Sequence, residues 1–60
     1  MNETRTHYRE APAEVSKASH RTVAAASTFA SQVSRDARVT HVQVVKAGRV
    51  VLTYRNGQRS

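Results

Sequence analysis

The chain lacks cysteine and has very few of the bulky residues that build a large core. Its 60 residues contain no tryptophan and three aromatic residues, which are Tyr8, Phe29 and Tyr54. Without thiols it can form no disulfide, and no thiolate can bind a metal or act as a nucleophile. A chain of this size makes one small domain at most, with a barely sufficient core. We therefore expect a homodimer, or a complex with a larger partner, to supply stability.

Acidic residues are also scarce, with four Asp and Glu against ten Lys and Arg and a net charge of +6. Residues 1–14 sum to −1, whereas residues 15–60 sum to +7 because Asp36 is their only acid. A basic segment of this kind is typical of a protein that meets a polyanion such as nucleic acid. The alternative is a solvated basic surface with no specific partner.

No apolar run is long enough for a signal peptide or a membrane span. The longest weakly polar stretch, residues 22–30, is rich in Ala, Ser and Thr and is too short to cross a bilayer. We expect a cytoplasmic protein with no membrane contact.

Catalytic and metal-binding patterns are missing as well. The sequence shows no nucleophile beside a base, no glycine-rich phosphate loop and no paired carboxylates. The three histidines, His7, His20 and His41, are scattered and have no carboxylate-rich neighbourhood. The sequence therefore predicts a protein that is not an enzyme and has no cofactor and no metal site.

The first half of the chain predicts an arm followed by one helix. Residues 1–10 show no periodicity and are interpreted as a flexible, disordered arm, leaving residues 11–60 as a single small domain. Pro12 suits the first position of a helix, and Glu14 suits its first turn. From there to about residue 37, apolar or small residues recur at steps of three and four, typical of one amphipathic helix face. These are Val15, Ala18, Thr22, Ala26, Phe29, Val33 and Ala37.

Residues 39–55 predict a β-hairpin with a tight turn. A three-residue loop at residues 46–48, with Gly48 in the left-handed conformation, would place Val45 opposite Arg49. One face of the hairpin then carries the more apolar set, which is Thr40, Val42, Val44, Val50, Leu52 and Tyr54. A two-residue loop at residues 47–48 would mix apolar and polar residues on both faces, so the first register is favoured.

These elements predict an α+β fold in which the helix over residues 12–37 packs on the hairpin over residues 39–55. In a dimer, two hairpins would pair into one four-stranded sheet backed by two helices. Both strands of a lone hairpin are edge strands, so a partner strand could also add to it.

Basic residues on both elements are the candidate nucleic-acid-binding residues. One cluster lies on the hairpin, where His41 and Gln43 could add contacts to base edges, since a two-stranded ribbon fits the major groove. A second cluster lies on the helix. The full set is Lys46, Arg49, Arg55, His41, Gln43, Lys17, Arg21, Arg35 and Arg38. The alternative is that these charges only discourage edge-to-edge aggregation and that His41 is an exposed strand residue.

The sequence thus favours a small, non-enzymatic regulatory protein that binds nucleic acid through a basic hairpin and helix surface. The alternative is a phage- or plasmid-type inhibitor or adaptor that docks on a protein by its ribbon edge or helix. Residues 38–43 and 48–53, after an Ala-rich helix, also resemble the small head–tail joining proteins of lambda-like phages. That resemblance implies a structural helix-plus-hairpin protein as a minor hypothesis, and it transfers no site residues.

Overall fold

The structure is a computed structural model that describes residues 2–60. It contains one α-helix and one antiparallel sheet of five strands. In chain order, these elements are β1 (Asn2–Tyr8), β2 (Val15–His20), α1 (Val23–Val33), β3 (Val39–Lys46), β4 (Arg49–Arg55) and β5 (Gln58–Arg59). The α+β class predicted from the sequence is therefore confirmed.

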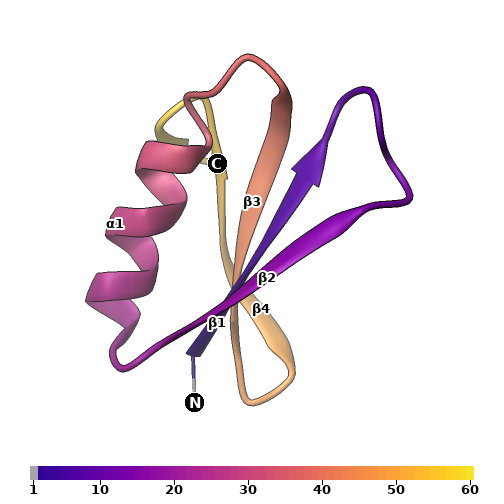
Figure 1. Ribbon diagram of the computed structural model, residues 1–60. Coiled ribbons are helices and arrows are strands. Elements are labelled where there is room, and N and C mark those ends of the chain that lie inside the picture. Colours follow the sequence, from indigo (N-terminus) through magenta and orange to yellow (C-terminus); the bar gives the residue numbers. More distant parts are fainter. Residues whose placement is uncertain (1) are drawn as a thin grey trace.

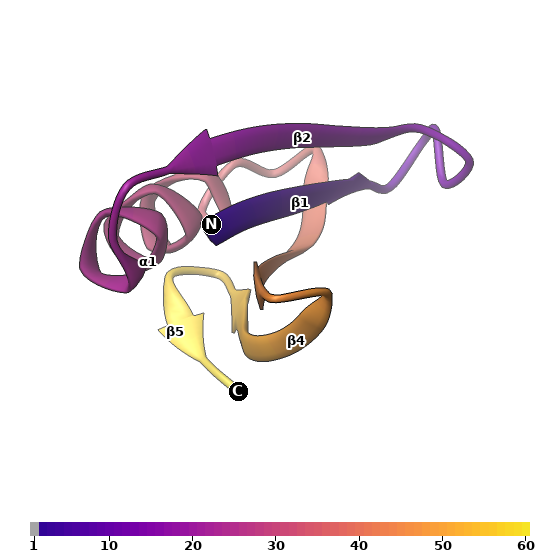
Figure 2. The same cartoon turned by 90° about the horizontal axis from the view of Figure 1, so that it is seen from below.

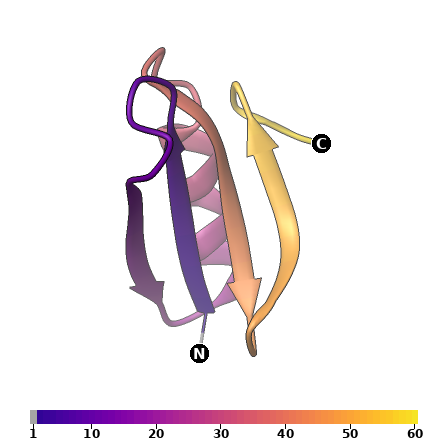
Figure 3. The same ribbon diagram turned by 90° about the vertical axis from the view of Figure 1, so that its right-hand side faces the viewer.

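The strands lie in the order β2-β1-β3-β4-β5, and the helix covers one face of the sheet (Figure 1). The sheet curves around α1, with β2 on one side of the helix and β5 on the other (Figure 2). Figure 3 looks onto the opposite face, where the helix lies behind the strands and no other element covers them. The fold thus has two layers and one uncovered sheet face.

The predicted flexible arm over residues 1–10 is wrong for residues 2–8, which form β1 and pair with both β2 and β3, while residue 1 lies outside the described residues. Its inner residues Thr4 and Thr6 are buried, at 0% and 3% exposure. No large apolar residue precedes Tyr8 in this strand, so a search for hydrophobic periodicity finds nothing there. Backbone pairing on both sides, which local sequence does not reveal, holds the strand in place.

The predicted helix over residues 12–37 is wrong at its first half, where residues 15–20 form β2. Pro12 occupies a turn between β1 and β2, closed by the Glu14 N–H donating to the Ala11 carbonyl at 2.9 Å. The helix begins later, at Val23, and the hydroxyl oxygen of the preceding Thr22 accepts from the Ala25 N–H at 3.0 Å and caps the first turn. The spacing of small residues before Thr22 therefore matched a helical period without forming a helix.

The core lies between α1 and the central strands. Ala26 and Ala30 are fully buried, and their small side chains let the helix backbone approach the sheet closely. They meet Val42 and Val44 of β3, which are also fully buried. The partly buried side chains that complete this core are Tyr8, Val33, Leu52 and Tyr54.

Strands β3 and β4 occupy the residues predicted for the hairpin, but the predicted turn is wrong. Lys46 pairs with Arg49, so the loop has two residues, Ala47 and Gly48, both with positive φ (52° and 78°), as in a type I′ turn. A bulge at Val51 then takes up one residue, so that Val44 faces Leu52. The bulge restores the alternation that a plain two-residue loop would have lost.

The hairpin is also not a free ribbon, because β3 pairs with β1 along its other edge. The sheet has five strands from one chain, not the four strands expected from two hairpins. Within residues 2–60, no helix is long and apolar enough to cross a membrane.

Candidate nucleic-acid interface

The uncovered side of the sheet, here called the open face, collects polar and basic side chains from four strands. Successive side chains of a strand point to opposite faces of the sheet. The buried residues and the residues paired with them face the helix, and the residues between them lie on the open face. One row across the strands is formed by directly paired residues, in the order Lys17, Arg5, Gln43 and Thr53. A neighbouring row contains His7 and His41, which are paired between β1 and β3.

Two histidines and a glutamine form the centre of the open face. The His7 and His41 rings stack with centroids 4.2 Å apart and planes 12° from parallel. The His7 Nε2 lies 2.8 Å from the Gln43 Oε1. An amide oxygen only accepts, so Nε2 of His7 carries the hydrogen and its Nδ1 is the free acceptor.

The His41 ring is oriented by Thr40. The Thr40 hydroxyl donates to the His7 carbonyl at 3.2 Å, and the same oxygen lies 3.0 Å from the His41 Nδ1. The Thr40 hydroxyl hydrogen is already donated to the His7 carbonyl, so Nδ1 of His41 must donate to the Thr40 oxygen. The His41 Nε2 is then the nitrogen that would gain a proton. Both rings are thus held in one tautomer, with one nitrogen each available to a ligand.

The surroundings of His41 oppose its protonation. Burial lowers the pKa of His41 below 6.5, and the nearby charges of His7 and Arg55 lower it further. The Arg55 side chain therefore acts electrostatically on the same part of the face, from the end of β4. At neutral pH the His41 ring is therefore an uncharged hydrogen-bonding group beside the fixed positive charge of Arg55.

Among residues 2–60, Glu3 is the one acidic group on the open face, and it is paired. The Arg5 Nε donates to the Glu3 carboxylate at 2.8 Å, and this bond lowers the pKa of Glu3. Lys17, directly across from Arg5 on β2, lowers the pKa of Glu3 a little more. The face also carries three cations, Lys17 on β2, Arg5 on β1 and Arg55 on β4, so its net charge is positive.

The structure brings together some of the residues predicted from the sequence and separates others. Lys17, His41, Gln43 and Arg55 share the open face. The other five lie elsewhere: Lys46 and Arg49 beside the β3–β4 turn, Arg21 before the helix, and Arg35 and Arg38 after it. The basic residues therefore do not group into one hairpin cluster and one helix cluster as predicted. One reason is that the first half of the predicted helix, which carries Lys17, is a strand.

Sequence reasoning missed Arg5 and His7, since both fall in the predicted flexible arm. A signal was present: residues 2–7 alternate strictly between Asn or Thr and charged or histidine residues. Such alternation is typical of a strand with two different faces, even when neither face is apolar.

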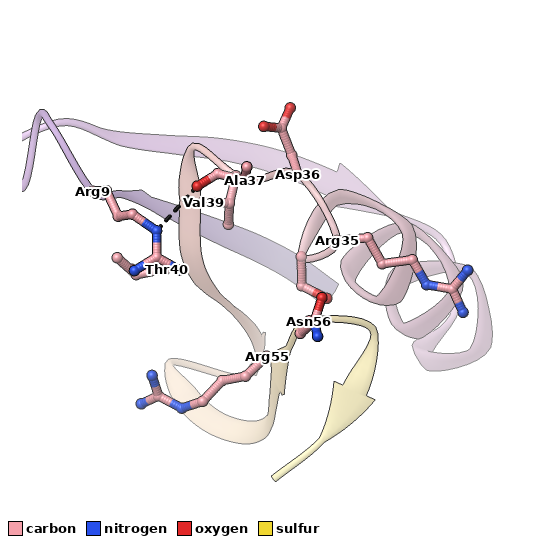
Figure 4. A pocket seen from close by; sticks show the side chains of 9 residues that line it. Arg9, Arg35, Asp36, Ala37, Val39, Thr40, Arg55 and Asn56 are labelled. Carbon is pink, nitrogen blue, oxygen red and sulfur yellow. Dashed lines mark hydrogen bonds between the residues drawn. The ribbon is translucent and has the colours of Figure 1, made fainter.

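A second feature lies at one end of the sheet, where the α1–β3 connection meets the ends of β1 and β4. It is a cleft of about 580 Å³ whose lining includes Arg9, Arg35, Asp36, Thr40 and Arg55. Figure 4 shows the Arg9 and Arg55 side chains on one side of this cleft and the Arg35 guanidinium pointing away from them. Arg55 and Thr40 thus belong to both the cleft and the border of the open face.

No group of three or more His, Cys, Asp or Glu side chains within residues 2–60 is placed to hold a metal ion. No protein-family model, curated protein sequence or solved structure matches this chain.

Proposed function

We propose that the protein is a small, non-enzymatic regulatory protein that binds nucleic acid across the open face of its sheet. The observation that carries this proposal is the gathering of Arg5, Lys17 and Arg55 on one uncovered surface whose single acid is already paired. Phosphate contacts supply most of the affinity of nucleic-acid-binding proteins, and basic side chains make them. The net charge of +6 would assist the approach of a polyanion.

Under this proposal, the open face has two roles. Lys17 and Arg55 lie on strands three positions apart in the sheet, so they are separated by roughly 14 Å across the strands. They would contact separate phosphates of one strand of nucleic acid. Between them, the Gln43 amide and the free nitrogens of His7 and His41 offer donors and acceptors to base edges.

The experiment that tests this proposal is fluorescence anisotropy with labelled single-stranded and double-stranded DNA and RNA, titrated with salt. The double variant Lys17→Glu/Arg55→Glu removes two contacts on the open face. It should weaken binding strongly and reduce the magnitude of the salt slope by about two.

The matched control is Arg21→Glu/Arg49→Glu, which makes the same change in net charge at positions off the open face. Both arginines are exposed and hold no side-chain hydrogen bond within residues 2–60. This variant should retain most of the affinity and nearly the same salt slope. Equal losses in the two variants, or no binding by the wild-type chain at low salt, would contradict the proposal.

A protein partner is the second candidate, and β2 is the feature that favours it. This six-residue strand is the longer edge of the sheet, and its outer side is unpaired within the part of the chain described here. A partner strand, or β2 of a second copy, could add there. The homodimer expected from the sequence stays a prediction, and sedimentation velocity at several protein concentrations measures it directly.

A further inference from the structure

We infer that the cleft between the α1–β3 connection and the ends of β1 and β4 is a binding site for a phosphate monoester. Its contacts come from Arg9 and Arg55, with Thr40 and Asn56 at its wall. The volume of about 580 Å³ is within the range of small-molecule sites. The inference goes beyond the proposed function, because Arg9 lies off the open face.

The charge of the cleft is positive, although one acid lines it. The Asp36 carboxylate is held by Arg38: Oδ1 accepts from the Arg38 backbone N–H at 2.9 Å, and Oδ2 accepts from its guanidinium at 2.9 Å. These bonds lower the pKa of Asp36 to about 2. In Figure 4 this carboxylate points away from the Arg9 and Arg55 guanidinium groups. Asp36 therefore neutralises Arg38 and leaves the cleft arginines uncompensated.

Arg9 is held in place before any ligand arrives. Its backbone N–H donates to the Arg38 carbonyl at 2.9 Å, and its Nε donates to the Ala37 carbonyl at 3.0 Å. Within residues 2–60, its two terminal amino groups have no hydrogen-bond partner. A guanidinium fixed at Nε loses little conformational freedom on binding, so its free edge is prepared for an anion.

The wall beside Arg9 is rigid as well. Thr40 is fixed by its bonds to the His7 carbonyl and the His41 ring. On the other side, the Ser34 hydroxyl accepts from the Gly57 N–H at 2.8 Å and so fixes the turn that carries Asn56 to the end of the helix. The two sides of the cleft are therefore positioned by the fold rather than by mobile loops.

The chemistry favours phosphate over carboxylate. A planar carboxylate is satisfied by one guanidinium fork, whereas a phosphate monoester has three acceptor oxygens and close to two negative charges. Arg9 comes from the end of β1 and Arg55 from the end of β4, so they approach a ligand from two different strands. Two such donors suit a tetrahedral dianion better than a carboxylate.

The ligand could be a free small phosphate or the terminal phosphate of a nucleic-acid strand, since Arg55 borders the open face. The test is an NMR titration of the ¹⁵N-labelled protein with inorganic phosphate, and with acetate at the same ionic strength. Binding of 5′-phosphorylated and 5′-hydroxyl oligonucleotides is then compared. Shifts at Arg9, Thr40 and Asn56 with phosphate and not with acetate are expected.

Three variants make the result specific. Arg9→Gln and Arg55→Gln should each weaken phosphate binding about tenfold or more, whereas Arg59→Gln removes the same charge outside the cleft and should leave it unchanged. Arg9→Lys keeps the charge without the guanidinium fork and should also lose affinity. Thermal melts of each variant establish that it is folded.

The outcomes separate the two sources and the two proposals. A preference for the 5′-phosphorylated strand identifies a strand end as the ligand, and phosphate binding without that preference identifies a small phosphate. Equal effects of phosphate and acetate, or equal losses in the Arg9→Gln and Arg59→Gln variants, would overturn the inference. Lys17→Glu tests the open face alone and Arg9→Gln the cleft alone, so either proposal can fail without the other.

Discussion

The imidazole rings of His7 and His41 lie stacked on neighbouring strands, 4.2 Å apart between centroids. His7 belongs to a segment that the sequence predicts as a flexible arm, and His41 belongs to the predicted hairpin. The stack forms because β1 pairs with β3 in the register that sets these two residues opposite each other. Burial of the His41 ring, and then the charge of the neighbouring His7, lower the pKa of His41.

The first prediction concerns stability and pH. The folded-state pKa of His41 is lowered from 6.5, so below that pH the unfolded chain binds more protons than the native one. The stability that His41 contributes is present above pH 6.5 and is lost as the pH falls through the lowered pKa. The midpoint of thermal unfolding should therefore drop between pH 7 and pH 5.

The control for this prediction is His41→Asn, which keeps a side-chain donor of similar reach but does not titrate. Its unfolding midpoint should depend less on pH over the same interval. A wild-type NMR titration that gives His41 a pKa at or above 6.5 would contradict the physical account.

The second prediction concerns Gly57, in the turn between β4 and β5. Its φ is +80°, and an added Cβ would lie 2.9 Å from the Arg35 Cγ and closer still to its Nε. Gly57→Ala should therefore cost more than the roughly 1–2 kcal/mol of a left-handed alanine alone. The measurement is the free energy of unfolding from urea denaturation.

Gly48 supplies the matched control for Gly57. Its φ is +78°, but a Cβ there would meet nothing within 4 Å, so Gly48→Ala should show the backbone cost alone. Placing Gly57→Ala in an Arg35→Ala background should reduce its cost to that of Gly48→Ala. If the two glycine variants lose equal stability in the wild-type background, the contact with Arg35 has no energetic role.

The third prediction concerns the β3–β4 turn. Ala47 has a φ of 52°, a conformation that alanine resists, whereas the equivalent position of the β4–β5 turn holds Asn56 at the same φ. Asn tolerates this conformation better than Ala, so Ala47→Asn should stabilise the protein by about 0.5–1 kcal/mol. Unchanged or lower stability in urea denaturation would argue against the type I′ turn.

The fourth prediction concerns the buried face of the helix. Ala30 is fully buried against the sheet, so Ala30→Leu should overpack the interface and cost about 1–3 kcal/mol. Ala25 is exposed on the same helix, and Ala25→Leu should change stability by no more than about 0.5 kcal/mol. Equal effects of the two substitutions would mean that this helix face does not pack as described.

Sequence reasoning located the hairpin because its signal is local. Alternating β-branched residues around Val42, Val44 and Leu52 predict strands whatever the rest of the chain does. The predicted loop was one residue too long, since a bulge at Val51 lets a two-residue loop keep the alternation. A bulge depends on how the two strands pair, and the residue type at position 51 does not predict it.

The candidate site was found in part for the same reason. His41, Gln43 and Arg55 were identified within the hairpin, whereas Arg5, His7 and Arg9 were overlooked because residues 1–10, which lack hydrophobic periodicity, were predicted to be a flexible arm. Lys17 was selected for its charge but assigned to a helix. Its place beside Arg5 depends on the pairing of β1 with β2.

The sequence by itself determined the excess of positive charge, the hairpin and the small buried helix residues such as Ala26. These follow from composition and from patterns within a few residues. The tertiary structure alone decided that residues 2–8 and 15–20 are strands, which strands are neighbours, and which cations share a face. Strand pairing joins residues far apart in the chain through backbone hydrogen bonds, which nearly every type of side chain allows. Polar segments can therefore form strands even though no local sequence pattern predicts it.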